Sequence, residues 1–135
     1  LTGVFGMPGM SGVGISFGAD RIYDVMNELD LFPATSADTT HVLFLNFGLA
    51  EEHYCLPFVG QLRQMGINTE IYPSAEKLKK QMRYADQKSI PLVVMAGESE
   101  MAGNSFTIKD MKQGGQQTLP SASLATTIYE LLQAK

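Results

Sequence analysis

The sequence predicts an α/β protein in which helices flank a mixed five-stranded sheet, in the order β-α-β-α-β-β-β-α over residues 41–135. Short apolar runs alternate with helix-period segments up to about residue 95, as in parallel strands joined by helices. Two alternating segments around a double glycine then indicate a hairpin. With 135 residues and 44% hydrophobic content, we expect one compact domain with room for a short extra piece.

The N-terminal segment is expected to hold a short strand and a helix. Residues 11–17 read SGVGISF, and after Gly18 apolar side chains recur at helical spacing. Residues 33–40, PATSADTT, are small and polar, which is typical of a linker. We therefore expect residues 1–32 and 41–135 to form separate units.

The larger unit begins with strands and helices in alternation. In order, these are a strand at 41–47, a helix at about 52–65, a strand at 67–72, a helix at about 75–88 and a strand at 92–95. This alternation implies right-handed crossovers and a parallel sheet, and the simplest arrangement places the first strand between the second and the third. Pro57 fits the first helix only in its first turn.

A hairpin and a helix complete the predicted fold. Residues 105–110 and 116–119 alternate in polarity on either side of Gly114-Gly115. Ser121 or Ser123 is expected to cap the last helix. Its core-facing stripe is Leu124, Ile128, Leu131 and Leu132.

Basic residues are concentrated in the second helix of this unit. Five of the ten basic residues lie between positions 77 and 88, with Asp86 the only acid there: Lys77, Lys79, Lys80, Arg83 and Lys88. We expect Leu78, Met82 and Ala85 to face the core, with the bases and Tyr84 on the opposite half of the helix. A cationic face with an aromatic ring suits a nucleic acid. The alternative is an ordinary solvated helix face.

Few other residues point to chemistry. The net charge of −4 argues against general binding of polyanions, although a local patch can still bind one. Cys55 is the single cysteine, so no disulfide within the chain is expected and a buried side chain is favoured over a reactive thiol. His41 and His53 do not establish a metal site, and we expect none. Glu98, Glu100 and Asp110 are expected to be loop acids that could also read bases or pair with Lys109.

The N-terminal glycines match neither the dinucleotide fingerprint nor the P-loop. What they offer is Arg21, three residues after Gly18 in the first turn of the expected helix. A guanidinium there could bind a phosphate, helped by the positive end of the helix. The alternative is an ion pair between Arg21 and Asp24 on the helix surface.

Two segments resemble a known family. GVGISFGADR resembles motif 3 of class II aminoacyl-tRNA synthetases, a glycine-rich strand that enters a helix carrying an arginine. The remainder, from GINTEIYPSAEKLKKQMRYAD to GGQQTLP, is similar to the C-terminal anticodon-binding domain of histidyl-tRNA synthetases. KLKKQMRYAD is the most specific piece. The resemblance implies that residues 1–32 are a remnant of a catalytic domain, 33–40 a linker and 41–135 an anticodon-binding domain.

The resemblance also implies a parent enzyme that activates histidine with ATP and magnesium and transfers it to histidine tRNA. Arg21 matches the motif 3 arginine that holds the ATP phosphates in this family, and Gly18 matches the glycine that keeps the adjoining backbone close. Motifs 1 and 2 are not in the chain, so a C-terminal fragment that is inactive and without a cofactor of its own is expected. The parent is expected to be a cytoplasmic homodimer that binds neither DNA nor a membrane.

For the anticodon itself, we expect Lys77, Lys80, Arg83 and Tyr84 to lie beside the sheet edge that receives the loop, with Lys79 and Lys88 adding unspecific attraction. Two alternatives remain. One is a synthetase-like accessory domain that binds protein and charges no RNA. The other is a small enzyme that uses Arg21 as a phosphate clamp.

Overall fold

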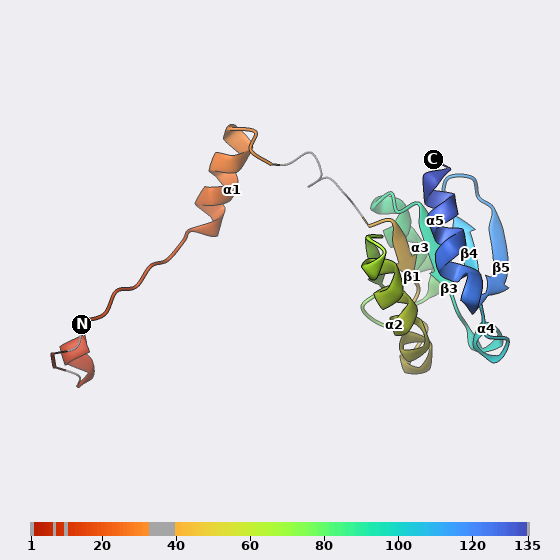
Figure 1. The fold of residues 1–135 in the computed structure, drawn as a ribbon, viewed down its shortest axis with the longest axis horizontal. Helices are drawn as coiled ribbons and strands as arrows, with labels where there is room; N and C mark the ends of the chain where they lie inside the picture. Colours follow the sequence, from red (N-terminus) through yellow and green to blue (C-terminus); the bar gives the residue numbers. More distant parts are fainter. Residues whose placement is uncertain (1, 7, 10, 33–39, 135) are drawn as a thin grey trace. The chain divides into compact units, whose positions relative to one another are not determined.

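The computed structural model describes residues 2–6, 8–9, 11–32 and 40–134. The chain divides into two compact units, Leu1–Ala37 and Asp38–Lys135. The first contains a 3₁₀ turn, η1 (Thr2–Phe5), and helix α1 (Ala19–Glu28) (Figure 1). None of the helices in the described part of the chain has the length and apolar character needed to cross a membrane.

The strand expected at residues 11–17 is not formed. This segment has no strand assignment, and Val13, Ile15 and Phe17 are 93%, 79% and 81% exposed. A strand is stable only when its backbone groups pair with a neighbour, and the described residues of this unit supply none. The prediction of a strand was therefore wrong for this chain, whereas the helix after Gly18 is confirmed.

The second unit is built on a five-stranded mixed sheet in the order β2-β1-β3-β4-β5 (Figure 1). The strands are β1 (Val42–Phe44), β2 (Thr69–Ile71), β3 (Leu92–Met95), β4 (Ser105–Asp110) and β5 (Gln116–Pro120). Strand β1 is parallel to β2 and β3, whereas β4 is antiparallel to both its neighbours. The predicted sheet, with the first strand between the second and third, is confirmed.

Helices cover the two faces of the sheet unequally. They are α2 (Leu49–Gln64), α3 (Leu78–Gln87), α4 (Glu98–Ala102) and α5 (Leu124–Gln133), with a 3₁₀ turn η3 (Ser121–Ser123) before α5. Helices α2 and α5 share one hydrophobic cluster with the sheet, and α3 contributes to a second. The sequence did not predict α4, because five residues are too few to display a helical period.

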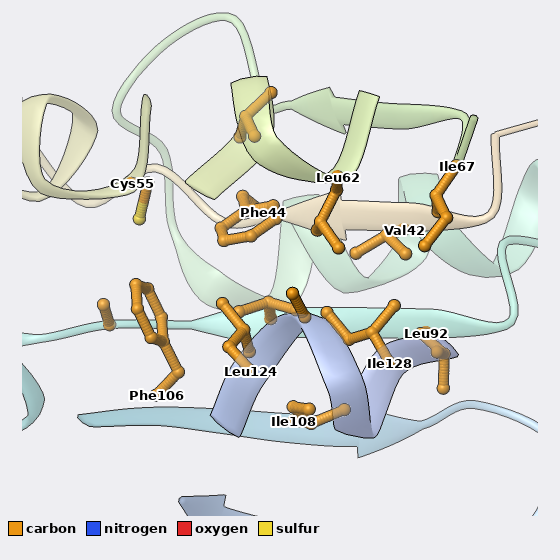
Figure 2. Close-up of a cluster of buried hydrophobic side chains, with 14 residues drawn as sticks. Val42, Phe44, Cys55, Leu62, Ile67, Leu92, Phe106, Ile108, Leu124 and Ile128 are labelled. Carbon is orange, nitrogen blue, oxygen red and sulfur yellow. The ribbon is translucent and has the colours of Figure 1, made fainter. Parts of the chain in front are cut away.

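The larger core lies between the sheet and helices α2 and α5. Figure 2 shows Phe44 of β1 and Phe106 of β4 on the same side of the sheet as Leu124 and Ile128 of α5. The two phenylalanine rings meet edge to face, with centroids 5.9 Å apart. Leu62 of α2 is 1% exposed in the same cluster. The predicted stripe of α5 faces this core, although Leu131 and Leu132 are only partly buried.

The smaller core lies between α3 and the other face of the sheet. Its buried members are Leu43, Leu45, Tyr72, Ala85, Ile90 and Val93. In an antiparallel pair, residues opposite each other project from the same face. Val93 of β3 lies opposite Lys109 of β4, and Met95 lies opposite Thr107. On this face the apolar surface of β1 and β3 therefore gives way to polar residues on β4.

Pro57 lies inside α2 and not in its first turn. The helix begins at Leu49, before the expected start near residue 52. Proline cannot donate a backbone hydrogen bond to the carbonyl of His53, four residues earlier. Both Pro57 and His53 are exposed. Water can therefore satisfy that carbonyl, and the helix continues.

Candidate nucleic-acid interface

Helix α3 is fixed to the sheet by a buried glutamine. The side chain of Gln81 is fully buried, and its Nε2 donates to the backbone oxygens of Asn46 and Glu76, each at 2.7 Å. Its Oε1 accepts from the backbone N–H of Asn46 at 2.8 Å. The expected inward stripe was thus wrong in one member. Gln81 faces the core, and Leu78 is 48% exposed.

Four basic residues and two methionines line an open groove of about 620 Å³ beside α3. Lys77 is the residue before the helix, and Lys79, Lys80 and Arg83 lie on it. The groove is completed by Met82, Asp86 and Met111. The four bases are exposed. Cations around an apolar floor can bind a phosphate and a flat ring side by side.

Lys80 is paired with a nearby acid. Its Nζ contacts Oε1 of Glu76, four residues earlier. This hydrogen bond lowers the pKa of Glu76 and raises the pKa of Lys80. The pair is exposed, so it weakens as salt is added. A ligand phosphate would therefore have to compete with the Glu76 carboxylate for the Lys80 ammonium.

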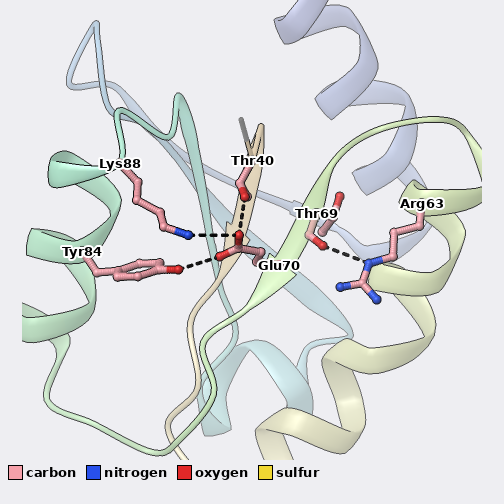
Figure 3. A network of polar contacts seen from close by, with 6 residues as sticks. All are labelled: Thr40, Arg63, Thr69, Glu70, Tyr84 and Lys88. Carbon is pink, nitrogen blue, oxygen red and sulfur yellow. Dashed lines mark hydrogen bonds and ion pairs between the residues drawn. The ribbon is translucent and has the colours of Figure 1, made fainter. Parts of the chain in front are cut away.

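Tyr84 and Lys88 lie toward the β2 edge of the sheet, where Glu70 binds both. Figure 3 shows the Glu70 carboxylate between Thr40, Tyr84 and Lys88. The Tyr84 hydroxyl donates to Oε2 of Glu70 at 2.8 Å, and Lys88 Nζ lies 3.4 Å from Oε1. Lys88 also lies over the Tyr84 ring at 4.9 Å, and the Tyr84 ring meets that of Tyr72 edge to face. Neither residue lines the groove.

This network sets the ionisation of Glu70. Partial burial raises the pKa of its carboxyl, but hydrogen bonds from Thr40 and Tyr84 and the charge of Lys88 outweigh burial, so the net pKa is lowered. The pKa of Lys88 is raised, chiefly through its contact with Tyr84. Glu70 therefore stays charged and holds α3 to the edge strand.

Polar side chains from β4 and β5 extend the surface beside the groove. Thr107 lies opposite Thr118, and their hydroxyl oxygens are 2.8 Å apart. Lys109 lies opposite Gln116 on the same face. The sequence did not indicate that this surface binds RNA. The alternation of Phe106 and Ile108 with polar neighbours in β4 was the signal that could have found it.

Glu100 of α4 lies next to this surface. Its Oε2 accepts from Ser99 Oγ at 2.8 Å and from the Gly97 N–H at 3.1 Å, and its Oε1 accepts from Thr107 Oγ1 at 3.2 Å. The Ser99 and Gly97 hydrogen bonds lower the pKa of the Glu100 carboxyl most. Glu100 thus accepts hydrogen bonds at the N-terminal end of α4. Asp110 ends β4, is buried, and accepts the backbone N–H groups of Lys112 and Gln113, so the expectation that these two acids lie in loops was wrong.

Arg21 and Gly18 belong to the first unit. Gly18 precedes α1, and Arg21 is exposed in its first turn. A Cβ added at Gly18 would lie 3.8 Å from Arg21 side-chain carbons, an ordinary contact. Within the described residues, a small side chain at position 18 would therefore fit. One feature of Arg21 is compatible with phosphate binding: it lies in the first turn of a ten-residue helix, near the positive N-terminal end.

Neither a cluster of metal ligands nor an exposed thiol lies in the described part of the chain. It contains no group of three His, Cys, Asp or Glu side chains placed to hold a metal ion. Cys55 is buried in the larger core, and burial raises the pKa of its thiol to about 12. The prediction of a buried cysteine is confirmed.

Comparison with known proteins agrees with this fold. The family model described as "Anticodon binding domain" matches residues 40–131. A histidine–tRNA ligase of Phocaeicola vulgatus is 52% identical over 128 residues, which cover 95% of this chain and 28% of that protein. One of Porphyromonas gingivalis is 52% identical over 132 residues, covering 98% and 29%.

A solved structure shows the same architecture. The crystal structure of histidyl-tRNA synthetase from Nostoc sp. PCC 7120 aligns with a TM-score of 0.67 at 26% identity, covering 86% of this chain and 28% of that one. The chain thus spans under a third of the length of the relatives it matches. Since the family model covers most of the larger unit, the chain belongs to the anticodon-binding domain family.

Proposed function

We propose that this chain recognises the anticodon of histidine tRNA as part of a histidine–tRNA ligase. The groove beside α3 is the observation that carries the proposal, because it gathers four of the ten basic residues of an acidic chain. If the net negative charge of this chain were spread evenly over its surface, it would repel RNA. A local cluster of basic residues attracts the phosphates of the loop while the rest of the surface does not bind polyanions.

The groove and the open sheet surface have different roles in this proposal. Lys77, Lys79 and Arg83 hold phosphates, and Met82 and Met111 offer an apolar floor to a base. The side chains of Lys109 and Thr118 supply donors and acceptors for the edges of unstacked bases. Thr107 is buried and bonded to Glu100 and Thr118, so it supports Thr118 from below the surface. A wrong base leaves such groups unpaired, which is how the site discriminates.

The other basic and aromatic residues of α3 contribute less directly. Lys80 adds positive potential and exchanges Glu76 for a phosphate when RNA binds. Tyr84 and Lys88 are held by Glu70, so we assign Tyr84 to positioning of the helix and Lys88 to long-range attraction. Long-range attraction falls off within about 8 Å at physiological salt.

For the whole ligase, we propose a cytoplasmic homodimer that uses ATP and magnesium. Arg21 and the first turn of α1, after Gly18, would hold phosphates of ATP, which supplies the leaving group when histidine is activated. The 135-residue chain alone is proposed to lack this activity, because the exposed guanidinium of Arg21 cannot by itself align two substrates.

The binding proposal is tested with a histidine tRNA transcript and the 135-residue chain. Fluorescence anisotropy over a salt series measures affinity and the number of phosphates neutralised. We expect weak binding that falls steeply with salt, and an Arg83→Gln change should reduce the salt slope by about one. Replacing the anticodon of the transcript should weaken binding further.

Arg63→Gln is the matched control for Arg83→Gln. It removes the same charged group from an exposed position on α2, outside the groove. Equal losses from the two variants would contradict the groove as the binding site. No RNA affinity, together with a mass that rises with concentration, would favour the accessory protein-binding alternative.

A further inference from the structure

The groove beside α3 is the first of three adjoining cavities. A cavity of about 200 Å³ shares Asp86 and Met111 with it. A third, of about 400 Å³, shares Pro91 and Lys112 with the second. The three cavities therefore follow one another from α3, past the β4–β5 turn, to the C-terminal end of α5. We call this path the cavity track.

Positive charge predominates along the cavity track. Its charged lining consists of five bases and one acid: Lys77, Lys79, Lys80, Arg83, Lys112 and Asp86. These five are half of the ten basic residues in a chain whose net charge is −4. Four of these bases line the first cavity, and Lys112 is the one base that the described residues place at the other two. Charge complementarity therefore favours an anionic polymer that enters the groove, with Lys112 placed to hold a phosphate farther along.

Lys112 stands on an anchored turn between the second and third cavities. The carboxylate of Asp110 accepts the backbone N–H of Lys112 at 2.8 Å. The residue before it, Met111, donates its backbone N–H to the Pro91 carbonyl at 2.9 Å. The turn is thus fixed to the start of β3, so the exposed Lys112 ammonium is presented from a rigid base.

The third cavity has the lining expected of a nucleobase site. Tyr129 is 48% exposed and lines it together with Ile67, Pro91 and Leu132. The exposed amide of Gln133 lies at the same cavity. Its volume falls within the range of about 300–1,000 Å³ typical of ligand pockets. An aromatic ring beside apolar walls stacks any base, and an amide can bond to its edge.

We propose that the RNA strand continues from the anticodon groove along the cavity track, with a phosphate on Lys112 and one nucleotide outside the anticodon stacked on Tyr129. This inference rests on the proposed function and adds a second binding point to it. The two binding points lie at opposite ends of one helix-and-turn surface, so each strengthens the other by raising its effective concentration.

The test compares binding of the histidine tRNA transcript to Tyr129→Leu and Tyr129→Phe variants of the whole chain. Stacking on an aromatic ring contributes about 1–3 kcal/mol per base, so the leucine variant should bind roughly tenfold more weakly. The phenylalanine variant keeps the ring and should bind as the unchanged chain does. Lys112→Gln should reduce the salt slope by about one, as Arg83→Gln does.

The outcomes separate this inference from the proposed function. If Arg83→Gln weakens binding but Tyr129→Leu and Lys112→Gln do not, the track is wrong and anticodon recognition stands. If none of the three matters, the proposed function fails as well. If Tyr129→Leu changes the oligomeric mass and not RNA affinity, the cavity binds protein and the inference is overturned.

Discussion

The two faces of the sheet differ in how completely they are covered. One face is closed by α2 and α5, and its core contains fourteen buried residues. On the other face α3 encloses six, and β4 continues beyond them with polar side chains. The first face stabilises the fold. The second gives up part of its apolar contact and keeps a surface on which RNA can lie.

The two faces also differ in the contacts that hold their helices. On the face covered by α2 and α5, the two-helix face, aromatic rings stack, with the Tyr54 and Phe106 centroids 4.9 Å apart. On the face covered by α3, the one-helix face, hydrogen bonds of Gln81 and Glu70 hold the single helix in position. A helix with few apolar contacts is located by directional bonds, and small errors in position would move the whole groove.

The largest expected effect comes from the two-helix face. Phe106→Ala should lower the free energy of unfolding by about 3–5 kcal/mol, because the ring is fully buried and its loss leaves a cavity. Denaturant unfolding followed by circular dichroism measures this. Leu49→Ala, at a residue 69% exposed, is the control and should change stability by about 0.5 kcal/mol or less. A loss at Phe106 no larger than at Leu49 would remove the contrast between the faces.

On the one-helix face, Gln81→Leu should cost about 2–3 kcal/mol. The substitution keeps the side-chain volume but leaves the backbone groups of Asn46 without their partner in the interior. Gln87→Leu, at an exposed position of the same helix, is the matched control. If the two variants unfold at the same denaturant concentration, the glutamine does not fix α3.

Charge on the open part of that face should alter RNA affinity and leave stability nearly unchanged. Lys109→Gln should weaken tRNA binding by about 1 kcal/mol and reduce the salt slope by about one. Anisotropy titration gives both values, and thermal unfolding checks the fold.

Two adjacent residues of β5, Gln117 and Thr118, test whether the position of a charge on one face of the sheet matters for RNA binding. Thr118 lies opposite Thr107 on the open face, whereas Gln117 lies opposite the buried Ile108 and so projects from the two-helix face. Thr118→Lys should strengthen tRNA binding more than Gln117→Lys does, since screening limits each charge to its own side. Equal gains would mean that net charge alone governs binding.

The smallest effect concerns pH. The folded-state pKa of Glu70 is lowered, so its contribution to stability is present above the unfolded value of about 4.3 and is lost as pH falls through the folded value. Glu70→Gln should therefore remove about 0.5–1 kcal/mol at neutral pH and make the acid side of the stability curve flatter. Unfolding midpoints measured from pH 7 downward test this. Glu130→Gln, on the exposed side of α5, should leave the curve unchanged.

Much of the fold could be predicted because its signals are local. Strand β3 and the β4–β5 hairpin lie where periodicity and glycines indicate, and α5 follows its stripe. The strand at 11–17 failed because pairing depends on a neighbour that a local pattern cannot supply. Pro57 was misplaced because the cost of a proline inside a helix depends on whether water can reach the carbonyl that loses its hydrogen bond, here that of His53.

The site could be predicted only in part. The concentration of basic residues between positions 77 and 88 indicated a cationic surface, and four of these residues line one groove. Counting could not show that Tyr84 and Lys88 turn to Glu70, which is distant in sequence. It also misassigned Gln81, since a glutamine can replace an apolar residue inside only when backbone groups from another segment meet it.

The arrangement of strands has a consequence for how the domain assembles. Strands β3, β4 and β5 are consecutive in the chain, so each pairs with a close neighbour, whereas β1 must find β3 across some fifty residues. Closing a long loop costs more entropy than closing a short one. Strands β3, β4 and β5, which carry the open surface, are therefore expected to pair early, before β1 joins β3.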